Sequence, residues 1–118
     1  MNKIEYMLVA ELMKRNSQNP KTQTGCCIVD VEGNVIGKGT NALPRGLELT
    51  EDDKKRLVED NDYALNLLEH AERNAIFNAI DNGKVSSLKG STLYVAYTPC
   101  VPCAQAIIAV GIAKVVDF

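Results

Sequence analysis

The stretch STLYVAYTPCVPCAQAIIAVGIAKVV, residues 91–116, decides the fold of this chain. Its first part, Ser91–Tyr97, shows the period-two alternation of a strand. An almost wholly apolar helix is predicted over Val101–Val110, and Gly111 ends it. Ala113–Val116 then predicts another strand. A strand, a short helix and a second strand indicate a parallel crossover, which is right-handed in nearly all proteins.

Four further elements, two strands and two helices, are predicted upstream of this unit. Cys26–Val31 and Asn34–Thr40 are short runs rich in Val, Ile and Cys, and the turn between them indicates a hairpin. Leu67–Asp81 places its apolar residues on one broad face, which predicts a helix with one buried side. Lys3–Asn16 predicts an amphipathic helix, because apolar residues recur at helical spacing at Ile4, Met7, Leu8 and Leu12.

The segment between the hairpin and the Leu67–Asp81 helix is the least regular. Thr50 followed by Asp53 resembles a helix N-cap with an acid at its third position, so a short charged helix is predicted over Thr50–Glu59. A solvated surface helix is the first interpretation, and a lid over a site is the alternative.

Size and composition indicate one domain and exclude several kinds of partner. The chain has 118 residues, of which 46% are hydrophobic and 24% charged. The net charge is −2, and no basic face collects phosphates, so a polynucleotide substrate is not expected. No apolar run is long enough to span a bilayer, so no membrane partner is expected. The N-terminus does not resemble a signal peptide, so we expect a cytoplasmic protein.

Two of the four cysteines have the spacing of a metal site. If Pro99 ends a loop, Cys100 and Cys103 lie in the first turn of the following helix, and both sulfurs can reach one point. The positive end of the helix dipole favours thiolates there. A divalent cation with a preference for sulfur is expected, and zinc is the default.

His70 is the only histidine of the chain, so any imidazole ligand must be this one. One imidazole and two thiolates leave a fourth position for water, which is typical of a catalytic zinc. Such water can ionise to hydroxide at neutral pH. Glu72, two residues further on, can take a proton from that water and deliver it elsewhere without being a ligand.

Two other interpretations compete with a catalytic zinc site. Cys26 or Cys27 could supply a fourth ligand and close a structural site, although adjacent strand residues should point to opposite faces. Cys100 and Cys103 could also form a redox pair. Neither alternative explains the position of Glu72.

The sequence resembles the deoxycytidylate deaminases of the cytidine deaminase superfamily. HAE at residues 70–72 and PCVPC at 99–103 match the H-x-E…P-C-x-x-C signature of zinc nucleobase deaminases. The family pattern also extends over LEHAERNAIFNAI, LKGSTLYV and PCVPCAQAIIAVGIAKVV. NPKTQTGCCIV resembles a D-P-x-T-Q-V-G stretch with Asn19 in place of Asp, and NALPRG resembles N-G-x-P-R-G with Ala42 in place of Gly.

The resemblance implies an activity, a fold and an assembly. It implies hydrolysis of dCMP to dUMP and ammonia with one zinc ion per chain, held by His70, Cys100 and Cys103. It implies a three-layer α/β/α sandwich with a mixed sheet, assembled as a homo-oligomer, either a hexamer or another even-numbered assembly. The family usually continues past the last strand predicted here. We therefore expect residues 1–118 to form one deaminase domain that is a very short member of the family, a truncated one, or one half of a site completed by a neighbour.

The resemblance also implies substrate contacts. Asn41 would contact the sugar, the Ala71 backbone would read the base, and Tyr97 would line the base pocket. The segment around Thr24, together with NALPRG, favours a deoxynucleoside monophosphate. The phosphate would be bound by a basic residue, for which the candidates are Lys21, Arg45, Arg73 and Arg56.

Other small substrates remain open within the superfamily, because relatives deaminate cytidine, guanine, a riboflavin precursor and tRNA adenosine. The acidic balance argues against tRNA. A domain that binds a nucleotide without turnover is a further alternative, and an intact Glu72 argues against it.

Overall fold

The computed structural model describes residues 2–19, 21–43, 47–97 and 99–118. The elements are α1 (Lys3–Lys14), β1 (Gly25–Val29), β2 (Val35–Thr40), α2 (Glu51–Glu59), α3 (Asn61–Leu67), α4 (Ala71–Asp81), a 3₁₀ turn over Val85–Ser87, β3 (Thr92–Val95), α5 (Val101–Ala109) and β4 (Lys114–Asp117).

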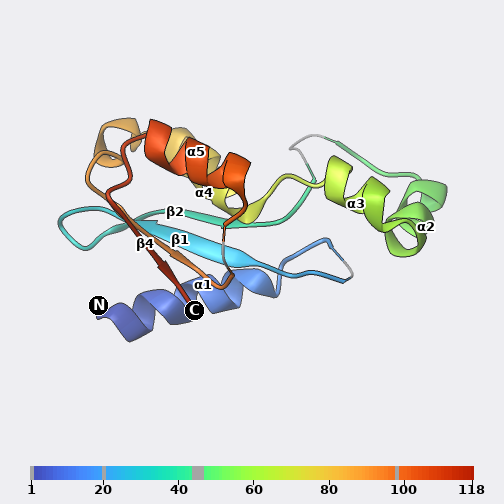
Figure 1. The fold of residues 1–118 in the computed structure, drawn as a ribbon, viewed down its shortest axis with the longest axis horizontal. Helices are drawn as coiled ribbons and strands as arrows, with labels where there is room; N and C mark the ends of the chain where they lie inside the picture. The colour runs from blue at the N-terminus through green and yellow to red at the C-terminus, as the bar shows by residue number, and fades with distance from the viewer. Residues whose placement is uncertain (1, 20, 44–46, 98) are drawn as a thin grey trace.

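One mixed four-stranded sheet forms the centre of the molecule, in the order β2-β1-β3-β4. β1 pairs antiparallel with both β2 and β3, whereas β3 and β4 are parallel. α1 covers one face of the sheet, and α4 and α5 lie on the other (Figure 1). The predicted three-layer α/β/α sandwich, the hairpin and the parallel β-α-β crossover are confirmed.

Two hydrophobic clusters fill the space between these layers. The larger joins the sheet to α4 and α5 and includes Ile28, Leu93 and Val95, which are fully buried. The smaller lies between the sheet and α1. Cys26 belongs to the first cluster and Cys27 to the second, so these adjacent cysteines point to opposite faces as predicted.

The long helix predicted over Leu67–Asp81 is wrong at its start. α3 ends at Leu67 and α4 begins at Ala71, while residues 68–70 run extended. The break occurs because Glu69 pairs with Ala42, which follows β2: Glu69 N donates to Ala42 O (2.8 Å) and Ala42 N to Glu69 O (3.1 Å). These tertiary bonds replace helical ones, and His70 becomes the N-cap of α4.

The predicted helix is present as α1, but the face that carries its large apolar residues is not the face that packs on the sheet. Ile4, Leu8 and Leu12 are 68%, 56% and 54% exposed, whereas Tyr6 and Ala10 are buried. The Tyr6 ring packs on Tyr94 with centroids 5.3 Å apart, and its hydroxyl donates to the Gly33 carbonyl (2.6 Å). A side chain at Gly25 would overlap the α1 backbone at Ala10 and Lys14. Close approach to β1 therefore requires the face with Ala10, not the most apolar face.

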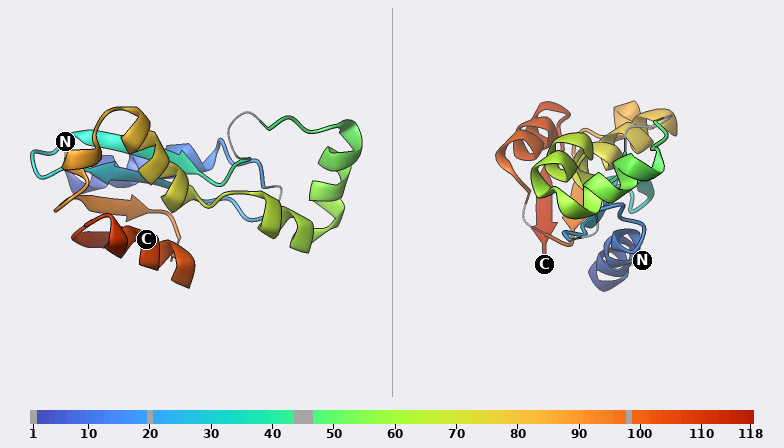
Figure 2. Two further views of the ribbon diagram at one scale, coloured as in Figure 1. Left: turned by 90° about the horizontal axis from the view of Figure 1, so that it is seen from above. Right: turned by 90° about the vertical axis from the view of Figure 1, so that its right-hand side faces the viewer.

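The predicted charged helix is present as α2, with Thr50 and Asp53 forming a capping box. Its acidic and basic residues are mostly exposed, and its buried Leu57 packs with Ala64 and Leu68 in a cluster separate from the main core. α2 and α3 lie beyond one end of the sheet (Figure 2). In the described part of the chain, no helix has both the length and the apolar character needed to cross a membrane.

Candidate functional site

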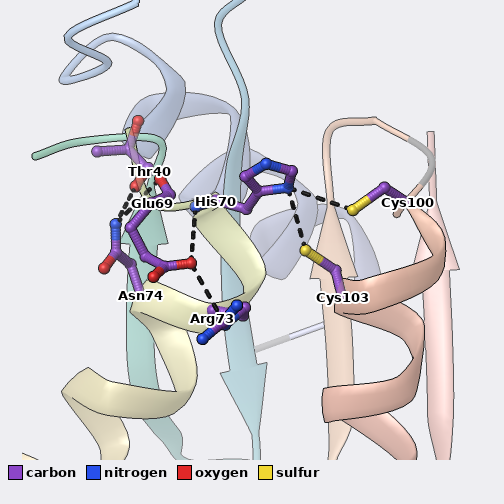
Figure 3. A network of polar contacts seen from close by, with 7 residues as sticks. All are labelled: Thr40, Glu69, His70, Arg73, Asn74, Cys100 and Cys103. Atoms are coloured by element: carbon purple, nitrogen blue, oxygen red, sulfur yellow. Dashed lines mark hydrogen bonds and ion pairs between the residues drawn. The ribbon is translucent and has the colours of Figure 1, made fainter. Parts of the chain in front are cut away.

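The N-termini of α4 and α5 meet beside each other and carry the three predicted metal ligands. His70 is the N-cap of α4 and Cys100 the N-cap of α5, both with extended backbone. Cys103 lies in the first turn of α5, directly after Pro102. Proline is tolerated there because a backbone N–H in the first turn has no helical acceptor. The His70 ring points toward both sulfurs (Figure 3). The start of α4 thus provides one ligand and the start of α5 provides two.

The three ligand atoms have the spacing of a tetrahedral zinc site. His70 Nδ1 lies 3.3 Å from Cys100 Sγ and 3.2 Å from Cys103 Sγ. All three atoms lie within 4.8 Å of one another. Zn–S and Zn–N bonds of the usual length at a tetrahedral angle would place nitrogen and sulfur about 3.5 Å apart. One nitrogen and two sulfurs are also the donors that zinc prefers.

The environment of Cys103 calls for a cation. Burial raises the pKa of this thiol well above its ordinary value, and a hydrogen bond to the Glu72 carboxylate raises it further. A buried thiol beside a carboxylate does not ionise alone, whereas a thiol that coordinates a metal is deprotonated outright. The residues present therefore fit a bound zinc ion.

Glu72 stands beside the ligands without belonging to the ligand group. It lies in the first turn of α4, is only 4% exposed, and is close enough to Cys103 to help raise the pKa of that thiol. Among the described residues, the metal-binding group contains His70, Cys100 and Cys103 alone. A buried carboxylate thus lies beside the metal-binding group without being one of its members.

The other two cysteines are engaged elsewhere. The Cys26 thiol lies 3.1 Å from the Ala71 carbonyl oxygen, and the Cys27 thiol lies 3.4 Å from the Tyr6 carbonyl oxygen on the opposite face of the sheet. Neither belongs to the metal-binding group in the described part of the chain. This geometry favours a site with three protein ligands over the closed four-ligand alternative.

A pocket opens next to the metal-binding group. Two of the three ligands, the proposed proton carrier, the loop before β1 and the end of α3 contribute to its wall. The lining residues are Asn19, Thr22, Thr24, Asn41, Ala64, Leu68, His70, Glu72, Tyr97 and Cys100. Thr24, Asn41 and Tyr97, predicted from the sequence as substrate contacts, thus share one pocket with His70 and Glu72.

Asn41 holds the pocket wall together. It is 8% exposed, and its Oδ1 accepts hydrogen bonds from Thr24 N (3.2 Å) and from the Ser17 hydroxyl. Its Nδ2 donates to Thr22 O (2.6 Å). One amide therefore ties the loop before β1 to the end of β2.

Comparison with known proteins identifies the family. Residues 1–118 match the model of the cytidine and deoxycytidylate deaminase zinc-binding region. The chain belongs to this family. Deoxycytidylate deaminases of Mus musculus and Homo sapiens are each 37% identical to it over 112 residues, covering 94% of this chain. The chain spans 61% of the length of these relatives.

Solved structures agree with the fold. The dCMP deaminase of cyanophage S-TIM5, in complex with dCMP and dUMP, has a TM-score of 0.76 at 26% identity and covers 98% of this chain and 82% of its own. A cytidine deaminase from Burkholderia pseudomallei has a TM-score of 0.62 at 21% identity, covering 92% of this chain and 76% of its own. At this identity, the similarity to the Burkholderia enzyme shows a shared fold and nothing more.

Sequence reasoning did not single out Asn19 as a pocket residue of this deaminase-family chain. Asn19 is 3% exposed, and its Oδ1 accepts from Lys21 N (2.9 Å) and Thr22 N (3.0 Å). Asparagine side chains commonly bond the backbone two residues onward. An Asn in a polar loop next to a predicted site could have indicated this turn.

The remaining predicted substrate residues are not gathered in the pocket. Ala71 is fully buried and is absent from the described lining. Lys21 is exposed and is likewise absent from it, and Arg45 lies outside the described residues. Tyr97, in contrast, does line the pocket, and its side chain is 58% exposed.

The two further phosphate candidates have partners within their own segments. Arg73 Nε lies 3.3 Å from a Glu69 carboxylate oxygen. The Arg56 guanidinium lies 4.1 Å from the centre of the Tyr63 ring and contacts Asp60. Neither arginine is among the pocket-lining residues.

Proposed function

We propose that this chain hydrolyses dCMP to dUMP and ammonia. The observation that carries the proposal is Glu72: a carboxylate that is only 4% exposed and lines the same pocket as the metal-binding residues His70 and Cys100. A structural zinc site has no use for such a group. The substrate is supported by relatives at 37% identity that are deoxycytidylate deaminases.

His70 through Nδ1, and Cys100 and Cys103 through their sulfurs, would hold one zinc ion. When bound, zinc supplies a nucleophile at neutral pH by lowering the pKa of a coordinated water to about 7. The positive ends of α4 and α5 both favour the two thiolates.

Glu72 is the proton carrier in this proposal. Its carboxylate accepts a proton from the attacking water, donates it to the ring nitrogen next to the amino-bearing carbon, and assists protonation of the departing amine. The carbon–nitrogen bond breaks, a carbon–oxygen bond replaces it, and ammonia leaves. Burial keeps bulk water from competing for this proton.

The other pocket residues would bind and orient the nucleotide. Asn41 and Thr24 line the same pocket as His70 and would hold the sugar, and the exposed Tyr97 ring would cover the base. The Ala71 backbone would read the base edge. Lys21 is our preferred candidate for phosphate binding among the described basic residues, since its backbone N–H belongs to the turn that Asn19 forms next to the pocket.

A substrate panel tests the proposal. Zinc-loaded protein is offered dCMP, CMP, deoxycytidine, cytidine and guanine, and deamination is followed by absorbance. Turnover of dCMP above all others is expected. Preferred turnover of cytidine or guanine would move the chain to another substrate within the family, and no turnover of any compound would favour a binding domain.

The domain organisation and the assembly stay proposals. We expect residues 1–118 to behave as one domain and to assemble as an even-numbered homo-oligomer. Light scattering after gel filtration measures the mass of the assembly. A monomer in solution would contradict the assembly. The cytoplasmic location stays a prediction.

A further inference from the structure

The outer edge of β2 is covered by three asparagines of one helix. Asn74, Asn78 and Asn82 follow each other at intervals of four residues on α4 and at its C-cap. We call them the asparagine ladder. Each bonds a backbone group of alternate β2 residues: Asn74 Nδ2 to Thr40 O (2.9 Å), Lys38 N to Asn78 Oδ1 (3.0 Å) and Asn82 Nδ2 to Ile36 O (3.3 Å).

The asparagine ladder works because two repeat lengths agree. Four helical residues advance about 6 Å, and two strand residues advance about 6.6 Å. A helix that lies along a strand can therefore place an asparagine at every fourth helical position beside every second residue of the strand, here three times. Sliding α4 along β2 would break all three bonds together, so the ladder sets the register of the helix on the strand.

The distance between α4 and β2 is set separately by small residues. A Cβ at Gly39 would overlap the Ala71 carbonyl and lie 2.5 Å from Ala75 N. A Cβ at Gly37 would overlap the Ala75 carbonyl and lie 3.0 Å from the Ala79 side chain. The helix therefore rests directly on the strand backbone. A shift of α4 along the strand would also move the N-terminus of the helix, where His70 and Glu72 lie.

Asn74 is the step of the ladder that reaches the site. Its Nδ2 lies 2.9 Å from Thr40 O and 3.5 Å from Glu69 O (Figure 3). Glu69 directly precedes the ligand His70, and its carboxylate also accepts a hydrogen bond from His70 N (3.2 Å). The Thr40 hydroxyl donates to Thr24 O (2.8 Å), and Asn41 follows in sequence. One amide thus joins the metal-binding side of the pocket to its substrate-binding side.

We propose that Asn74 is a positioning residue that holds His70 and Glu72 in register with the wall formed by Thr24 and Asn41. The inference rests on the function proposed above. Asn78 and Asn82 hold the same helix on the same strand, further from the pocket. They stabilise the pair of elements, whereas Asn74 also fixes the geometry between zinc, proton carrier and substrate.

The experiment compares Asn74→Ala with Asn78→Ala. Each removes one side-chain bond between α4 and the edge of β2, so a comparable fall in Tm is expected. For Asn74→Ala we expect kcat/KM for dCMP to fall about 10- to 100-fold, mostly in kcat, as for other residues that support a metal site. Asn78→Ala should stay within about twofold, because its bond lies a full helical turn away from Asn74.

A second variant tests the chemistry of the contact. Asn74→Asp keeps the shape but presents a carboxylate oxygen to two carbonyl oxygens, so it should lose at least as much activity as Asn74→Ala. Full activity in a folded Asn74→Asp protein would overturn the proposal. Equal losses in Asn74→Ala and Asn78→Ala would also overturn it, because the effect would then be one of general stability.

The rate of zinc loss to a chelator separates this inference from the proposed function. If the wild-type protein turns over no compound of the panel, the substrate proposal fails, and zinc loss still decides the role of Asn74. Faster loss in Asn74→Ala than in Asn78→Ala supports positioning of His70. Equal rates contradict it.

Discussion

The two sides of the pocket are built in different ways. The metal-binding side consists of His70, Cys100 and Cys103, which come from two short motifs at the starts of two helices. The proposed substrate-binding side consists of Asn41 and the loop that it ties down through three hydrogen bonds. The first depends on local geometry and a cation, and the second on side chains that satisfy backbone groups far away in sequence. Each side should therefore fail in its own way when altered.

Removing a ligand should have the largest effect. Cys103→Ala leaves only His70 and Cys100, so zinc content and turnover of dCMP should both fall to background. Cys27→Ala is the matched control, because this cysteine is equally buried but lies on the opposite face of the sheet. It should keep about one zinc per chain by metal analysis. Zinc loss in Cys27→Ala would contradict the ligand assignment.

Changing the proton carrier should separate metal binding from catalysis. Glu72→Gln keeps the size and the burial of the side chain but removes the base, so turnover should fall about 10²- to 10⁴-fold. Zinc content should stay at the wild-type value. Activity that survives in this variant would mean that Glu72 does not carry the proton.

Breaking the other side of the pocket should leave the metal in place. Asn41→Ala leaves Thr24 N and Thr22 O without their partner, and kcat/KM for dCMP should fall about 10- to 100-fold at unchanged zinc content. Asn16→Ala, an exposed asparagine outside the pocket, serves as control. Loss of zinc in Asn41→Ala would show that the two sides are not separable.

The smallest effect is expected at Asn19. Asn19→Asp keeps the oxygen that accepts from Lys21 N and Thr22 N, so KM for dCMP should stay within about twofold. Asn19→Ala removes the acceptor and should raise KM more than Asn19→Asp does. Equal KM values for the two variants would show that the turn does not shape the pocket.

Much of the metal-binding side could be predicted from the sequence, because its geometry follows from helix starts. Cys100 and Cys103 at i and i+3 share a helix face wherever that helix packs. The break before His70 could not be predicted, because it depends on pairing between Glu69 and Ala42. The apolar pattern continues across the break, since Leu67 and Leu68 pack in the cluster around α2 and α3 instead.

Side-chain contacts across the fold were the least predictable. The orientation of α1 follows from the space that Gly25 leaves for the α1 backbone at Ala10 and Lys14, whereas hydrophobic spacing alone favoured another face. The role of Asn41 as a tie between two segments depends on backbone groups whose positions no local pattern indicates. The same holds for the asparagine ladder, which in sequence is only three polar residues on a helix.

The sequence alone determined the parallel crossover, the three residues that group as possible metal ligands and the place of Glu72, because each depends on spacing within one element or one short motif. Only the tertiary structure decided which residues form the pocket wall, which face of α1 is buried, and how α4 is held in register on β2. Those features depend on close contact between backbones and on the partners of buried polar groups. Such partners are found only once distant segments have come together.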